Sequence, residues 1–86
     1  MKELKLKIAK NICYTKLVYI RISKKLKINL SNESIEKLIK KTIFTSSKIE
    51  KKGKNYYVYN FDNQIRVTVN ANNFRVITTD SLKTKK

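Results

Sequence analysis

The hydrophobic periodicity of the chain changes near residue 46, and this change constrains the fold most strongly. Before that point apolar residues recur every three or four positions, as they do along one side of a helix. After it they alternate with polar residues, which is typical of strands with one buried face. We therefore expect an α+β domain, in which two to three N-terminal helices pack on one face of a C-terminal four-stranded antiparallel β-meander.

The helical part is expected over about residues 3–45. A short amphipathic helix covers residues 3–12, and Thr15 is a suitable N-cap for a second helix. Ser31 is a good N-cap for a third helix, which continues to about Phe44. The polar run TSSK that follows is expected to end it.

The sheet is expected over about residues 47–80, with a charged tail at 81–86. Gly53, the only glycine, is the natural position for a positive φ angle in the first turn. The whole chain, 1–86, is expected to be a single domain, because a second core would need roughly 50 more residues. The four expected strands lie around Ile49 and over residues 54–60, 64–70 and 74–80.

The clearest alternation lies in the third expected strand. Ile65, Val67 and Val69 should face the helices, which turns Arg66 and its alternate neighbours outward. Val58 and Val76 join the core in the preferred register. The opposite register, which would turn these residues outward, remains possible for the second and fourth strands. The preferred register brings one set of polar side chains onto the open face: Tyr57, Tyr59, Arg66, Thr68, Arg75 and Thr79.

The chain is strongly basic. Twenty-one Lys and Arg residues against six Asp and Glu residues give a net charge of +15, which attracts polyanions such as nucleic acid. Eighteen of the 21 basic residues are lysines. Codon bias in an AT-rich genome is therefore an alternative source of the excess.

Residue types exclude several kinds of site. The sequence has no histidine and one cysteine, so it can form neither an intramolecular disulfide nor a histidine-dependent catalytic site. Cys13 is expected to be a core thiol, and no metal or cofactor is expected. The start MKELKLKIAKN has no uninterrupted apolar run, so we expect no signal peptide or membrane span and a cytoplasmic protein.

The expected open face has the chemistry of a surface that binds RNA or single-stranded DNA. Tyrosine rings and guanidinium planes stack on unpaired bases, while lysines interact with phosphates. The same residue types also suit an exposed strand surface and make cross-strand pairs, which is the structural alternative. The candidate nucleic-acid-binding residues are Lys16, Arg21, Lys52, Lys54, Tyr57, Tyr59, Arg66, Thr68 and Arg75.

Four blocks, NICYTKLVYIRI, INLSNESIEKLI, KKGKNYYV and IRVTVNANNFRVIT, resemble a bacterial family catalogued as domain of unknown function 3781. The resemblance covers roughly residues 4–82 and implies no established activity. More remotely, the Thr-Lys step that opens an Arg-bearing helix, together with the closing RVIT strand, is similar to the RelE, barnase and EndoU group of small RNases and toxins. In the relatives with the closest helix pattern, a histidine follows the Thr-Lys step. Here Leu17 holds that position, and Arg21 holds the arginine position four residues later.

The remote resemblance implies a nucleic-acid-binding module that is a degenerate RNase fold rather than an enzyme. One alternative is a metal-independent ribonuclease toxin without histidine, in which Arg66 and Arg75 stabilise phosphate charge and Lys54 or Tyr57 removes the 2′-hydroxyl proton. An acidic antitoxin would then cover the same face. Another alternative is a protein-binding inhibitor of a bacterial nucleic-acid-guided defence system, which would bind an acidic patch of its target.

Overall fold

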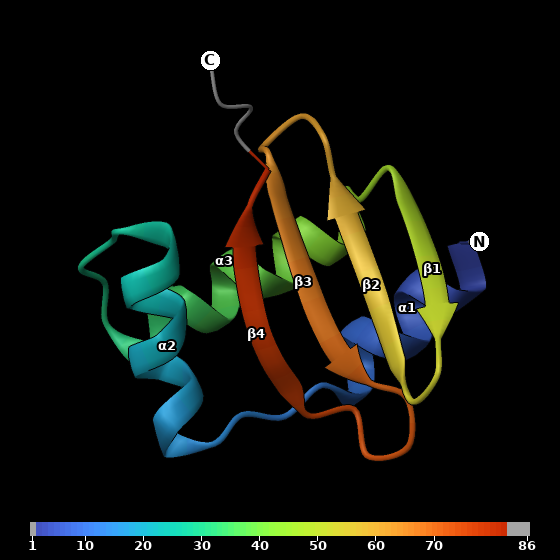
Figure 1. Ribbon diagram of the computed structural model, residues 1–86, viewed down its shortest axis with the longest axis horizontal. Coiled ribbons are helices and arrows are strands. Elements are labelled where there is room, and N and C mark those ends of the chain that lie inside the picture. Colours follow the sequence, from blue (N-terminus) through green and yellow to red (C-terminus); the bar gives the residue numbers. More distant parts are fainter. Residues whose placement is uncertain (1, 83–86) are drawn as a thin grey trace.

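The computed structural model describes residues 2–82 and contains three helices followed by four strands (Figure 1). This confirms the expected α+β class and the expected order of elements. The fourth strand begins two residues later than predicted, because Phe74 adopts φ 59° at the end of the preceding turn. The elements are α1 (Lys2–Asn11), α2 (Lys16–Leu26), α3 (Asn32–Phe44), β1 (Lys48–Lys52), β2 (Asn55–Asn60), β3 (Ile65–Asn70) and β4 (Val76–Ser81).

Two side-chain caps fix where α2 and α3 begin. The Thr15 hydroxyl oxygen accepts a hydrogen bond from the Val18 amide at 3.3 Å. The Ser31 hydroxyl oxygen accepts one from the Ser34 amide at 3.2 Å. Each cap satisfies an amide that has no partner within the helix, so both N-cap predictions are confirmed.

The strands form one antiparallel sheet in the order β1-β2-β3-β4. Gly53 lies in the β1–β2 turn with φ +59°, which confirms the prediction for this glycine. The pairing of β3 with β4 shifts between Thr68 and Val69, because Thr68 lies opposite Thr78 whereas Val69 lies opposite Val76. Ile77 is therefore an extra residue in β4, a β-bulge.

The helices cover one face of the sheet and one of its edges. In Figure 1, α1 and α3 lie behind the strands, while α2 lies beside β4. Within residues 2–82, no helix lies on the opposite face of the sheet, and this side is called the outer face below. The core between the layers consists of Ile8, Ala9, Val18, Ile22, Ile35, Ile39, Ile43, Val58, Val67, Val69 and Val76, each at most 3% exposed.

Two sequence predictions about side-chain placement are wrong. Thr79 was expected on the open face but is fully buried opposite Val67, because the bulge at Ile77 reverses the alternation in the rest of β4. Cys13 was expected in the core but is exposed. Its backbone amide instead donates to the Phe74 carbonyl oxygen, which ties the α1–α2 connection to the start of β4.

Candidate nucleic-acid interface

One row of side chains crosses the whole outer face. The strand register places Lys48 opposite Tyr59, Tyr59 opposite Arg66, and Arg66 opposite Asp80. Neighbouring strands are about 4.8 Å apart, so these four positions span roughly 14 Å. Lys25 of α2 reaches the end of the row by binding Asp80. We call Lys48, Tyr59, Arg66, Asp80 and Lys25 the cross-sheet row.

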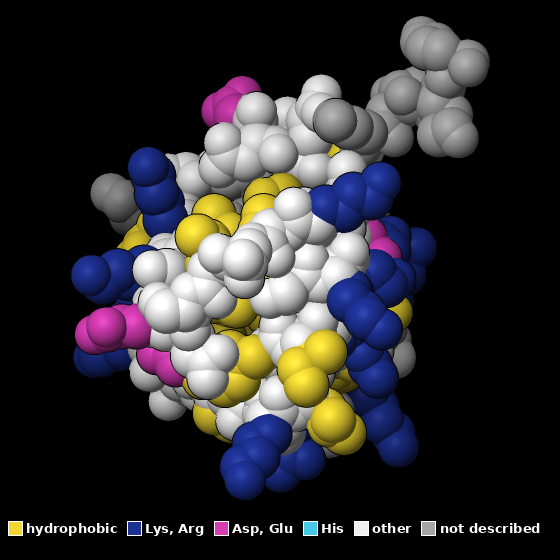
Figure 2. All heavy atoms as spheres, turned by 90° about the vertical axis from the view of Figure 1, so that its left-hand side faces the viewer, with side chains coloured by type: hydrophobic (Ala, Val, Ile, Leu, Met, Phe, Trp, Pro, Cys, Tyr) yellow, Lys and Arg dark blue, Asp and Glu magenta, His cyan; other side chains and the backbone are white. Residues whose placement is uncertain are grey.

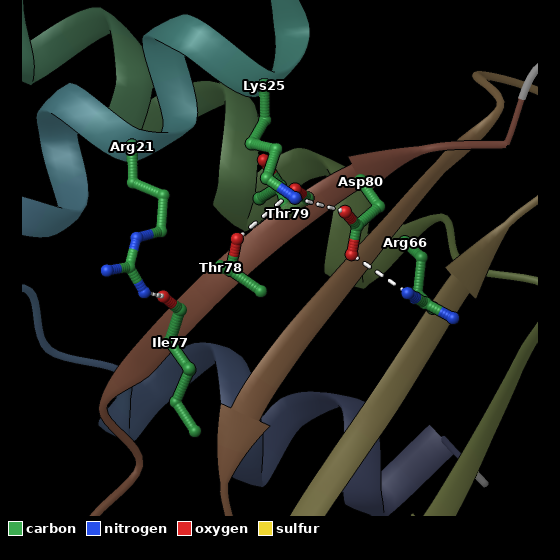
Figure 3. A network of polar contacts seen from close by, with 7 residues as sticks. All are labelled: Arg21, Lys25, Arg66, Ile77, Thr78, Thr79 and Asp80. Carbon is green, nitrogen blue, oxygen red and sulfur yellow. Dashed lines mark hydrogen bonds and ion pairs between the residues drawn. The ribbon is translucent and has the colours of Figure 1, made fainter.

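Asp80 joins the two basic groups at one end of the cross-sheet row. One carboxylate oxygen lies 2.9 Å from Lys25 Nζ and the other lies 2.8 Å from Arg66 Nη2 (Figure 3). Burial alone would raise the pKa of the Asp80 carboxyl, but the hydrogen bonds from Arg66 and Lys25 outweigh it and lower that pKa. Asp80 thus stays ionised and fixes the directions of both cations.

Cations already lie beside the two outer tyrosine rings. The Arg66 guanidinium carbon is 5.7 Å from the centroid of the Tyr57 ring, and Lys48 Nζ is 5.0 Å from the centroid of the Tyr59 ring. The Tyr59 ring also lies 5.9 Å from the ring of Phe61, which is 54% exposed. These contacts are weak at exposed sites, about 0.5–1 kcal/mol each, so an incoming base can replace them or stack on the guanidinium plane.

Arg21 and Arg75 lie at a different place, between α2 and the start of β4. Arg21 Nη1 donates a hydrogen bond to the Ile77 carbonyl oxygen at 3.4 Å, which ties α2 to the bulged edge strand (Figure 3). Both arginines line an open pocket of about 260 Å³, called the α2–β4 pocket below. Its lining residues are Thr15, Leu17, Val18, Arg21, Arg75, Val76 and Ile77.

The remaining predicted binding residues are divided between the edges and the interior of the outer face. Lys52 and Lys54 are exposed at the β1–β2 turn, and Lys16 is the exposed first residue of α2. Thr68 has the predicted outward register between Tyr57 and Thr78. It is only 4% exposed, however, so its neighbours cover it and leave little of it for a ligand to contact.

The four candidate catalytic residues do not form one cluster. Lys54 lies in the β1–β2 turn, and Arg66 lies against Tyr57 and Asp80. Arg75 lies five positions before Asp80 along the β4 segment, roughly 15 Å at strand spacing. The two arginines therefore lie in different surroundings, Arg66 on the outer face and Arg75 beside the α2–β4 pocket.

Sequence reasoning did not include Lys25, Lys48 and Asp80 among the site residues. Lys25 and Asp80 are 55 positions apart in the chain, so no local pattern connects them. Asp80 faces outward only because of the bulge in β4. Lys48 was not distinguishable from the other lysines, because its position opposite Tyr59 depends on the β1–β2 register.

A second polar group lies between α2 and α3. The Tyr19 hydroxyl donates to a Glu36 carboxylate oxygen, and this hydrogen bond raises the pKa of Tyr19 to about 12. The Tyr14 ring stacks on the Tyr19 ring with centroids 5.4 Å apart. Burial, with the charge of Glu36, raises the pKa of Tyr14 as well. Both hydroxyls are therefore held in the neutral form, which suits a structural contact.

A family model described as "Protein of unknown function (DUF3781)" matches residues 6–80, which confirms the resemblance to that family. No curated protein and no solved structure matches the chain. The more remote similarity to the RelE, barnase and EndoU group is therefore not confirmed. Within residues 2–82, none of the helices combines the length and the apolar character needed to cross a bilayer.

Proposed function

The chain belongs to the DUF3781 family, and we propose that it binds single-stranded RNA or single-stranded DNA on the outer face of its sheet without cleaving it. The observation that carries this proposal is the cross-sheet row. It combines cations from β1, β3 and α2 with an aromatic ring on a face that no helix covers. Phosphates attract the cations and unpaired bases stack on the ring, so both parts of a single strand find a partner.

The charge balance supports a polyanion as the ligand. Three of the six carboxylates are already engaged: Asp80 with two cations, Glu50 with Lys48 at 3.4 Å, and Glu36 with Tyr19. With 21 basic and six acidic side chains, the chain carries a large excess of positive charge that its own carboxylates cannot neutralise. Such a surface binds phosphates mainly by releasing the counterions that surround the nucleic acid.

The alternation of cation and ring favours a single strand over a duplex. Lys48 and Arg66 lie on either side of Tyr59, two strand spacings or roughly 10 Å apart. A base that stacks on Tyr59 can thus have its flanking phosphates near both cations. In a duplex the base faces are covered by their neighbours, so the tyrosine ring would gain nothing from stacking.

The pairing of Arg66 favours binding over cleavage. Cleavage needs a group that stabilises phosphate charge close to a group that removes a proton. Arg66 does lie beside Tyr57, but its guanidinium is already paired with Asp80, while Arg75 lines the α2–β4 pocket and Lys54 lies in the β1–β2 turn.

The test is a binding curve for a fluorescent 12-nucleotide single-stranded RNA at 50 and 200 mM KCl. Three to four phosphate contacts predict that affinity falls roughly 20- to 50-fold over this range, because each contact adds about 0.7 to the logarithmic salt slope. The RNA should stay intact on a denaturing gel. Salt-independent binding would refute the electrostatic account, and cleaved RNA would refute the binding-only proposal.

A further inference from the structure

Helix α2 exposes two large apolar side chains on its outward side. Leu17 is 71% exposed and Ile20 is 58% exposed. They are three positions apart, so they are neighbours on one side of the helix. Figure 2 views the molecule from the side on which α2 lies and shows hydrophobic side chains at the surface with Lys and Arg side chains beside them. Neither residue takes part in the outer face of the sheet.

Two shallow, open hollows border these side chains. An open pocket of about 340 Å³ is lined by Leu17, Ile20, Arg21, Lys24 and Lys25. The α2–β4 pocket, on the β4 side, shares Leu17 and Arg21 with it. The two hollows therefore meet at Leu17 and Arg21. One is lined by α2 alone, and the other lies between α2 and the start of β4. We call Leu17, Ile20, Arg21, Lys24 and Arg75 the α2 surface.

We propose that the α2 surface docks an acidic amphipathic segment of another protein. One or two apolar side chains of that segment would enter the hollows beside Leu17 and Ile20. Its carboxylates would pair with the guanidinium groups of Arg21 and Arg75, which suit bidentate contacts, and with the amine of Lys24. This site borders the proposed nucleic-acid interface at Lys25, which lines the pocket beside α2 and also belongs to the cross-sheet row, but Leu17 and Ile20 lie outside that interface.

The observations favour this occupant over three others. A second copy of the chain would bring two α2 surfaces together and set Arg21 and Lys24 against the same cations of the partner. A single-stranded nucleic acid would bring its phosphates to Arg21 and Lys24, but its bases stack on aromatic rings and guanidinium planes rather than on aliphatic side chains such as Leu17 and Ile20. A membrane is flat on this scale, whereas the side chains of a protein segment can fill two hollows.

The probe is a fluorescein-labelled 14-residue peptide of glutamates with leucines at three positions spaced three and four residues apart. Binding is measured by anisotropy at 150 mM NaCl, and the site is mapped by amide chemical shifts of the ¹⁵N-labelled protein. We expect the largest shifts at residues 17–25 and 75–77. The double variant Leu17→Ser with Ile20→Ser should weaken peptide binding at least tenfold, because it removes most of the exposed apolar surface.

Matched controls separate this site from general charge attraction. Leu6→Ser on α1 removes a side chain that is also exposed, at 48%, and should change peptide affinity less than twofold. The double variant should bind single-stranded RNA within twofold of the original protein, so the two proposals can fail independently. If the double variant does not fold, Lys24→Glu provides the second test. It reverses one exposed charge and should lower the affinity for the peptide at least threefold.

Four results would overturn the proposal. The first is equal binding of a peptide in which serines replace the leucines, because charge alone would then explain the affinity. The second is a shift map centred on the outer face of the sheet. The third is binding to phosphatidylserine vesicles that depends on Leu17 and Ile20 and that the peptide does not displace. The fourth is a dimer in sedimentation that the double variant abolishes.

Discussion

Replacing Asp80 with Asn should raise the affinity of the protein for single-stranded RNA. The change raises the net charge from +15 to +16, since five acidic residues remain against 21 basic ones. It also frees Arg66 and Lys25 from the carboxylate that now holds them at 2.8 and 2.9 Å. Each additional phosphate contact should increase affinity roughly fivefold at 0.1 M salt and steepen the logarithmic salt slope by about 0.7.

The same substitution should lower stability. The side chains of Asp80 and Arg66 are 26% and 34% exposed, so solvent screening limits the loss to about 1 kcal/mol. For a domain of this size, that loss lowers Tm by about 4–8 °C. Because the pKa of Asp80 is lowered in the folded state, its contribution is present above the usual carboxyl range and is lost as the pH falls below it.

The matched control is Asp62→Asn, which makes the same change in net charge in the exposed β2–β3 turn. Anisotropy titrations with a 12-nucleotide RNA at two salt concentrations compare the two variants. We expect at least a fivefold gain for the Asp80 variant and less than a twofold gain for the Asp62 variant. Equal gains would show that only net charge matters, and no gain in a folded Asp80 variant would show that Arg66 and Lys25 do not meet the RNA.

Three further substitutions test other parts of the account. Tyr59→Ala should cost about 1–3 kcal/mol of RNA binding through lost stacking, while Tyr59→Phe should bind nearly as well as the original; equal losses would point to the hydroxyl instead. Asn60→Ala should cost about 3 kcal/mol of stability and lower Tm by more than about 10 °C. The Asn60 side chain is fully buried, and its amide nitrogen donates to the Thr42 carbonyl oxygen at 3.1 Å and to the Thr45 hydroxyl, while its oxygen accepts from the Asn63 amide. A Tm change below about 3 °C in a thermal melt would contradict this. The hydrogen bond to Glu36 raises the pKa of Tyr19 to about 12, so the folded protein holds the Tyr19 hydroxyl proton more tightly than the unfolded chain does. This hydrogen bond therefore contributes fully to stability below about pH 10, and its contribution declines towards pH 12. Tyr19→Phe should make that alkaline decline shallower in denaturant titrations, and an unchanged slope would argue against the assignment.

Local rules were sufficient to predict the elements of this fold. Thr15 and Ser31 cap helices because a hydroxyl before an apolar stripe can accept a hydrogen bond from the amide three residues later. Gly53 has a positive φ in the first turn, a conformation that glycine adopts without strain because it has no Cβ. Each of these predictions depends only on residues close together in the sequence.

Predictions that depended on tertiary register failed where β4 is irregular. Ile77, Thr78 and Thr79 are all β-branched and suit either face, so their types give no sign of a bulge. The bulge buries Thr79 and turns Asp80 outward, where it binds a lysine from a helix 55 positions earlier.

The helix pattern likewise did not distinguish a wide buried stripe from a narrow one. Leu17 and Ile20 flank the apolar stripe of α2 in the sequence, yet only Val18 and Ile22 of this helix are buried. Apolar residue type alone therefore overestimated how much of α2 packs against β4. The two exposed side chains are the basis of the proposed docking surface.

The most direct test of the central claim is a chemical-shift titration of the ¹⁵N-labelled protein with a single-stranded 12-nucleotide RNA. We expect the largest shifts on the outer face, at Lys48, Tyr57, Tyr59, Arg66 and Asp80. The amides of Lys7 and Lys10, on the exposed side of α1 behind the sheet, should move little. Shifts of similar size on α1 and on the outer face, or no shifts at saturating RNA, would contradict a localised nucleic-acid interface.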